Sequence, residues 1–164
     1  TYCGAKHAKV VTNATSALHL AYLAVGLKKN DLVWTSPNTF VSTANAALYC
    51  GAKVDFVDID PSTYNMSVLA LKDKLKKAEN SGELPDLVVP VHFSGQSCEM
   101  KEIWELSKKY DFKVVEDASH ALGGEYMGRK VGNCEYSHMC VFSFHPVKMI
   151  TTAVSYTHLT LPTI

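Results

Sequence analysis

Short apolar runs alternate along the chain with longer segments in which apolar residues recur three or four positions apart. The first pattern predicts buried strands and the second predicts helices. Strands are predicted at residues 8–13, 31–36, 53–59, 86–91, 112–116 and 138–144. Helices are predicted at residues 15–26, 41–51, 67–80 and 99–110. Strands that alternate with helices of this length favour an α/β fold.

The strands consist of nearly uninterrupted apolar residues, as in "DLVVPV" and "FKVVE". A strand with this composition is buried on both faces, which is typical of parallel strands covered by helices on each side. The pattern therefore predicts a three-layer α/β/α fold with a mostly parallel sheet. In such sheets ligands bind at the carboxyl ends of the strands.

Composition narrows the functional classes. The chain has 164 residues, of which 47% are hydrophobic, and this is enough to form the core of one domain or a piece of a larger one. Its formal net charge is zero. The charge balance argues against a nucleic-acid partner, because phosphate binding needs a basic surface. No apolar run is long enough to span a membrane and no signal peptide opens the chain, so we expect no membrane partner and a cytoplasmic protein.

The cysteine pattern argues against a disulfide framework. Five cysteines occur without any C-x-x-C pair, which favours a reducing compartment. Cys134, His138 and Cys140 lack the spacings of a zinc site, so no metal is expected and buried, inert thiols are the simpler interpretation.

Polar residues follow several predicted strands. "NATSA" opens the first helix with Thr15 and Ser16, and a helix N terminus with hydroxyl groups suits a phosphate. The alternative is an ordinary helix cap. There is no G-x-G-x-x-G or Walker A sequence, so neither a dinucleotide nor a nucleoside triphosphate is indicated.

Asp117 ends the buried run "VVED". A carboxylate there needs either a cation or hydrogen-bond donors. A protonated heteroaromatic nitrogen would serve, since two unit charges in contact attract by about 4 kcal/mol at an effective dielectric constant near 20. The alternative is that Asp117 caps a helix beginning at "DASHA".

Lys148 follows the apolar strand "VFSF", which delivers it to the same sheet edge. An amine at that place can form an imine with an aldehyde, although its position taken alone favours an ordinary surface lysine. A phosphate-binding helix, a carboxylate for a ring nitrogen and an amine are together the attachment points of pyridoxal 5′-phosphate.

Four segments carry a family likeness. "NATSALHLAYLAVGL", "SPNTFVSTANAALYCGAKVDFVDID", "VVEDASHALGGEYMGRKVGN" and "VFSFHPVKMITTA" resemble the DegT/StrS sugar aminotransferases. The resemblance implies that residues 1–153 are part of the large, pyridoxal-phosphate-binding domain of the aspartate-aminotransferase-like fold (fold type I). Residues 154–164 depart from the family pattern and look like a translated sequencing adapter, so we expect a non-native tail there.

The resemblance also implies roles for single residues. Lys148 would carry the cofactor on its amine and move the proton in catalysis, and Asp117 would pair with the protonated ring nitrogen. His120 stands where the family has Gln or His near the phenolic oxygen, although it could also be a cap or a core residue. His92 and His145 receive no role.

Further implied residues surround the ring and the phosphate. Phe40 would stack on the ring face, with plain core packing as the alternative. The residues implied for the phosphate are Thr15, Ser16 and Ser143.

The implied reaction is a transamination with glutamate as donor and a UDP-linked 4-keto-6-deoxy-N-acetylhexosamine as acceptor, carried out by a homodimer. We expect this piece alone to be inactive. Two alternatives remain: an aminotransferase for another keto-sugar nucleotide, acting at C3 or C4, and a non-catalytic cofactor-binding or regulatory module. An oxidoreductase is disfavoured because no glycine fingerprint follows a strand.

Overall fold

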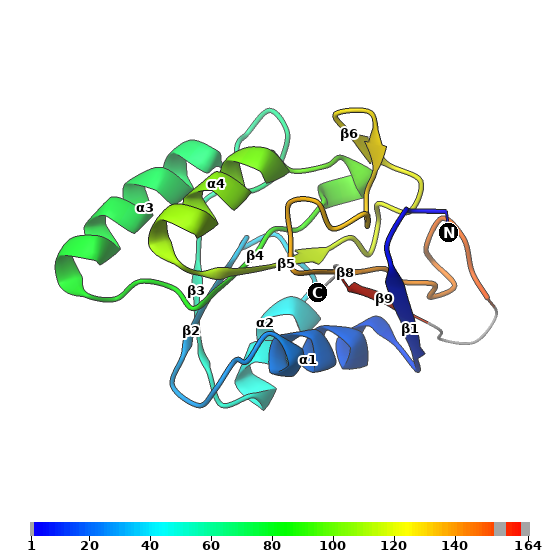
Figure 1. The fold of residues 1–164 in the computed structure, drawn as a ribbon, viewed down its shortest axis with the longest axis horizontal. Coiled ribbons are helices and arrows are strands. Elements are labelled where there is room, and N and C mark those ends of the chain that lie inside the picture. Colours follow the sequence, from blue (N-terminus) through cyan, green and yellow to red (C-terminus); the bar gives the residue numbers. More distant parts are fainter. Residues whose placement is uncertain (1, 153–156, 162–164) are drawn as a thin grey trace.

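The computed structural model describes residues 2–152 and 157–161 (Figure 1). Within these residues a seven-stranded sheet has the order β3–β2–β4–β5–β8–β9–β1. Neighbouring strands from β3 to β8 run parallel, and β9 runs antiparallel to both β8 and β1. The strands are β1 His7–Val11, β2 Leu32–Thr35, β3 Lys53–Phe56, β4 Leu87–Val89, β5 Lys113–Asp117, β8 Met139–Val141 and β9 Thr157–Leu161.

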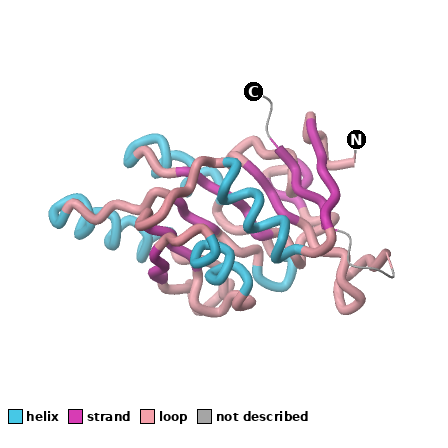
Figure 2. The backbone as a smooth tube through the Cα atoms, turned by 90° about the horizontal axis from the view of Figure 1, so that it is seen from below, coloured by secondary structure: helices cyan, strands magenta, loops and turns pink. Residues whose placement is uncertain are grey.

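Helices cover both faces of the sheet. Helices α1 (Ala14–Ala24) and α2 (Ser42–Tyr49) lie on one face, and α3 (Val68–Ser81) and α4 (Met100–Tyr110) lie on the other (Figure 1). Seen from below in Figure 2, α1 and α2 lie in front of the strands. The predicted three-layer fold with a mostly parallel sheet is confirmed.

Alternate strand residues supply two separate cores. Val33, Val89 and Val115 pack in the cluster that includes α1 and α2. Their neighbours Trp34 and Val114 belong to the cluster that includes α3 and α4. Because side chains alternate between the faces of a strand, the central strands β2 and β4 carry buried apolar residues on both faces.

The chain reverses its direction across the sheet between β2 and β4. From β2 it passes through α2 to β3 on one side, and from β4 it passes through α4 to β5 and on to β8 on the other. The loops that leave the carboxyl ends of β2 and β4 therefore diverge, and a crevice forms between them. The candidate site lies at this edge.

Two small elements were not predicted from the sequence. A two-stranded hairpin joins β6 (Glu125–Tyr126) to β7 (Arg129–Lys130), and a 3-10 turn, η1, spans Phe93–Gly95. The hairpin strands are too short for an alternating pattern, and their turn signal is Gly128 at a φ of 76°.

The prediction of a non-native tail remains untested. Residues 154–156 and 162–164 of that segment lie outside the described residues, and residues 157–161 form β9 between β1 and β8. No helix in residues 2–152 and 157–161 has the length and apolar character needed to cross a membrane.

Candidate active site

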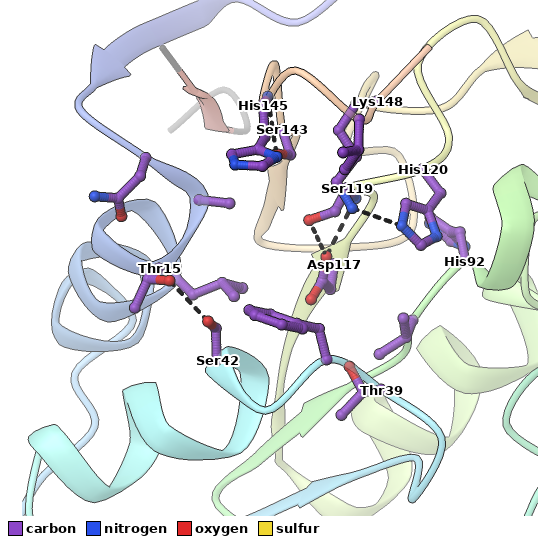
Figure 3. A pocket seen from close by; sticks show the side chains of 16 residues that line it. Thr15, Thr39, Ser42, His92, Asp117, Ser119, His120, Ser143, His145 and Lys148 are labelled. Atoms are coloured by element: carbon purple, nitrogen blue, oxygen red, sulfur yellow. Dashed lines mark hydrogen bonds between the residues drawn. The ribbon is translucent and has the colours of Figure 1, made fainter. Parts of the chain in front are cut away.

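A cavity of about 320 Å³ lies at the carboxyl edge of the sheet (Figure 3). Its size falls in the range of pockets that hold small ligands and cofactors. Every site residue predicted from the sequence lines this cavity except Ser16. The polar and aromatic residues around it are Asn13, Thr15, Thr39, Phe40, Ser42, His92, Asp117, Ser119, His120, Ser143, His145 and Lys148.

Asp117 forms the polar floor of the cavity. Its side chain is buried, with 4% exposed. Oδ2 accepts a hydrogen bond from Thr43 Oγ1 at 2.7 Å, and Oδ1 accepts from the amide and hydroxyl of Ser119 at 3.1 and 2.6 Å. None of the ion pairs in the described part of the chain includes Asp117. The cavity therefore presents a buried carboxylate whose protein partners are neutral.

Two hydrogen bonds join the main chain of Asp117 to the segment after β4. Its N–H donates to Pro90 O at 3.0 Å and its C=O accepts from the N–H of His92 at 3.1 Å. After it the chain turns, and the Ser119 amide bonds back to the carboxylate rather than opening an α-helix. The alternative that Asp117 caps a helix is therefore wrong.

Lys148 and His120 face each other across the mouth of the cavity (Figure 3). Lys148 Nζ lies 2.7 Å from His120 Nε2. Burial and the neighbouring Lys148 ammonium lower the pKa of His120, while Asp117 opposes this effect. His120 is thus a neutral acceptor for the lysine N–H. Since its side chain is exposed and bonded to Lys148, His120 is not a core residue.

The N terminus of α1 forms the opposite end of the cavity. Thr15 Oγ1 lies 2.7 Å from Ser42 Oγ, which joins α1 to the first turn of α2. Asn13 Oδ1 accepts the N–H of Ser16 at 2.8 Å, and the Ser16 hydroxyl faces Thr12 at 3.5 Å. The Ser16 amide is therefore occupied by the cap, whereas Thr15 and Ser143 face the cavity.

Phe40 stands on the segment between β2 and α2 with 74% of its surface exposed. The alternative of plain core packing is therefore wrong. An exposed aromatic ring that lines a cavity beside a buried carboxylate is available to cover a flat ligand.

Ser42, Thr43 and Ser119 were not assigned a role from the sequence. Ser42 and Thr43 lie in "TFVST", where they look like the first positions of a helix. Their position at the start of the helix that follows β2 was the available signal. Ser119 is a turn residue whose contact with Asp117 is local, so "DAS" suggested at most a cap.

The cavity combines three features that fit pyridoxal phosphate. Asp117 is a buried carboxylate that lacks a cation in the described part of the chain, Lys148 offers an amine, and the α1 N terminus with Thr15 offers donors and a positive dipole end for a phosphate. Together with the three-layer α/β fold, they define the class of fold type I pyridoxal-phosphate enzymes.

Comparison with known proteins narrows this class. The profile of the DegT/DnrJ/EryC1/StrS aminotransferase family matches residues 1–154, and the chain belongs to this pyridoxal-phosphate-dependent family. Over 151 residues it is 52% identical to the UDP-4-amino-4,6-dideoxy-N-acetyl-beta-L-altrosamine transaminase of Campylobacter jejuni, which covers 92% of this chain and 38% of the relative.

Two further proteins are similar to this chain over nearly its whole length. The GDP-perosamine synthase of Caulobacter vibrioides is 38% identical over 151 residues, covering 92% of this chain and 38% of the relative. The structure of Helicobacter pylori PseC, an aminotransferase involved in the biosynthesis of pseudoaminic acid, matches with a TM-score of 0.86 and 35% identity, over 97% of this chain and 41% of that one. The chain thus spans about two fifths of the length of these relatives.

Proposed function

We propose that the full-length protein is a pyridoxal-phosphate-dependent aminotransferase that moves the amino group of glutamate to a UDP-linked 4-keto-6-deoxy-N-acetylhexosamine. The 52% identity to a transaminase named for a UDP-linked 4-amino-4,6-dideoxy sugar supports this choice of acceptor. The cavity supports the choice of cofactor.

One observation carries the proposal. The carboxylate of Asp117 is buried among neutral donors, in the same cavity as the amine of Lys148. An ionised carboxylate in such a place is costly without a cation opposite. A protonated pyridine nitrogen supplies this cation, and the aldehyde of the same molecule would lie toward Lys148.

The residues then have distinct tasks. Thr15, Ser42 and Ser143 would bind the phosphate together with the N terminus of α1, and Phe40 would cover one face of the ring. Asp117 would hold the ring nitrogen protonated. When bound, pyridoxal phosphate withdraws electrons from the substrate carbon that bears the amino group, so that a proton can leave it.

Lys148 is the residue that moves this proton. Its Nζ lies at the mouth of the cavity, where the hydrogen bond from Nζ to His120 Nε2 fixes its direction. Because His120 is neutral, it can accept this hydrogen bond without repelling the ammonium. As a free amine Lys148 takes the proton from one carbon atom, and as an ammonium it returns the proton to another.

We also propose a homodimer in which the partner subunit completes the site. The rim of the cavity is open here, with Phe40, His145 and Val147 exposed. An acceptor as large as a nucleotide sugar needs further walls, and these would come from the rest of the protein and from its partner.

Absorption spectroscopy and product identification test the proposal. The full-length protein should absorb visible light after incubation with pyridoxal phosphate, and Lys148→Ala should abolish that band while Lys76→Ala, a change on the exposed face of α3, keeps it. Mass spectrometry with glutamate and either UDP-linked or GDP-linked keto sugars would identify the acceptor. An unchanged band in Lys148→Ala would refute the assignment, and amination of the GDP-linked sugar alone would refute the acceptor.

A further inference from the structure

A second buried carboxylate lies directly before Asp117 in β5. Glu116 is 5% exposed. Because neighbouring strand residues point to opposite faces, Glu116 lies behind Asp117 rather than in the cavity. Its Oε2 lies 2.7 Å from His92 Nε2, and its Oε1 accepts a hydrogen bond from the hydroxyl of Ser137.

His92 connects Glu116 to the cavity. Its side chain is fully buried and lines the cavity wall. The amide of Cys98 donates to His92 Nδ1 at 3.0 Å, so that nitrogen must keep its lone pair and the proton sits on Nε2, which donates to Glu116. Both ring nitrogens are therefore engaged, and the ring has a single orientation.

Two influences on the pKa of His92 oppose each other. Burial lowers the pKa, and the contacts with Cys98 and Glu116 oppose this effect. A second proton would have to sit on Nδ1, however, where it would confront the amide N–H of Cys98. We therefore assign His92 as the neutral tautomer, which leaves Glu116 as an ionised carboxylate with neutral partners.

The other groups around Glu116 do not neutralise it. Tyr126 and Lys130 line a small cavity beside it. The ammonium of Lys130 is 2.7 Å from the carboxylate of Glu125 and is partly exposed to solvent. In the described part of the chain, no lysine or arginine forms an ion pair with Glu116, and its carboxylate is bonded to the neutral His92 ring and the Ser137 hydroxyl.

The same pair also fixes the position of Asp117. The backbone N–H of His92 donates to Asp117 O, while the His92 ring is held by the side chain of Glu116. The segment after β4 and the end of β5 are therefore linked twice.

We infer that Glu116 and His92 are positioning residues for the cofactor: the pair fixes Asp117 and places a second negative charge behind it, which strengthens the hold of the site on a protonated ring nitrogen. This inference rests on the proposed function. At an effective dielectric constant near 20, a negative charge about 10 Å from a titrating nitrogen raises the proton affinity of that nitrogen by roughly tenfold. The effect of Asp117 itself, in contact with the ring, is larger.

The test measures the ring nitrogen directly. The full-length protein is loaded with pyridoxal phosphate carrying ¹⁵N in the ring, and the nitrogen chemical shift is followed against pH. Glu116→Gln, which removes the charge with little change in shape, should lower the proton affinity of the nitrogen roughly tenfold and weaken cofactor binding several-fold at alkaline pH. Asp117→Asn should have the larger effect.

Two controls separate charge from packing. Ser137→Ala removes a hydrogen bond to Glu116 but keeps the charge, and Glu116→Asp keeps the charge on a shorter side chain. Both should leave the nitrogen titration within about threefold of the unmodified protein, even where they lower the melting temperature. Asp73→Asn, an exposed change on α3, should alter nothing.

The outcomes are distinct. A titration in Glu116→Gln equal to that of the unmodified protein overturns the inference and leaves the proposed function intact. If Glu116→Gln does not fold, Ser137→Ala and Glu116→Asp decide. A tenfold shift in either variant overturns the inference, because it shows that packing governs the nitrogen, whereas titrations within about threefold in both support it. Failure of the unmodified protein to bind the cofactor would instead refute the proposed function.

Discussion

Replacing Gly95 with alanine would place a methyl group against the turn that carries His120. Gly95 has a φ of 90°, and a Cβ built on it lies 2.7 Å from the carbonyl oxygen of His120. Real contacts of this kind are longer, so the two backbones must separate by several tenths of an ångström. Because this turn orients His120 toward Lys148, the change should reach the 2.7 Å contact between Nε2 and Nζ.

Gly82 provides the matched control. It ends α3 at a φ of 76°, and a Cβ there meets no atom within 4 Å. Alanine at either position costs about 1–2 kcal/mol for the left-handed backbone. Only Gly95→Ala adds the steric conflict, for which about 1–3 kcal/mol is typical of overpacked sites.

Chemical denaturation and cofactor titration of both variants in the full-length protein measure these effects. Gly95→Ala should be more destabilised than Gly82→Ala by about 1–3 kcal/mol and should bind pyridoxal phosphate less tightly. Gly82→Ala should bind it like the unmodified protein. Equal stability and equal affinity in the two variants would refute the close approach of Gly95 to His120.

Three further predictions concern single side chains. The folded protein lowers the pKa of His120, so as the pH falls the unfolded chain takes up this proton first. The stability that neutral His120 contributes should therefore be present above pH 6.5 and be lost as the pH falls below that value. In His120→Asn, the melting temperature should depend less on pH in this window. Thr43→Val removes the donor 2.7 Å from Asp117 Oδ2 and should cost about 1–3 kcal/mol in urea unfolding, whereas no loss would show that the hydrogen bond contributes nothing. Phe40→Ala should change stability by less than about 0.5 kcal/mol yet weaken cofactor binding several-fold, and equal binding would exclude Phe40 from the ring face.

The layered fold could be predicted because the local pattern is strong. Strands such as Leu87–Val89 are apolar at each position, and the helices between them are long enough to cross over the sheet. The strand order could not be predicted, since nothing local specifies that β4 pairs with β2 rather than with β3. Several strands also end earlier than their apolar runs, as β4 does at Val89, before Pro90, which has no N–H to donate.

The candidate site was predictable where one residue type carries the chemistry. Lys148 and Asp117 each had an ordinary alternative, a surface lysine and a helix cap, but their occurrence together with a phosphate-binding helix pointed to one site, and the structure places both in one cavity. The sequence does not indicate a role for Ser42 and Thr43, because hydroxyl residues begin many helices. The contact of His92 with Glu116 joins two strand ends that are distant in sequence, so only the three-dimensional structure reveals it.

The order of the chain has a consequence for biosynthesis. Thr15 lies on α1 and Lys148 lies after β8. Between them in sequence, the segments that follow β2 and β4 and the end of β5 also line the cavity. A ribosome would therefore release the proposed phosphate-binding residues early and the proposed anchoring amine late. With these roles, the vitamin-derived cofactor cannot be captured covalently until that amine emerges, so the strands from β1 to β8 are synthesised before this ligand can stabilise the sheet.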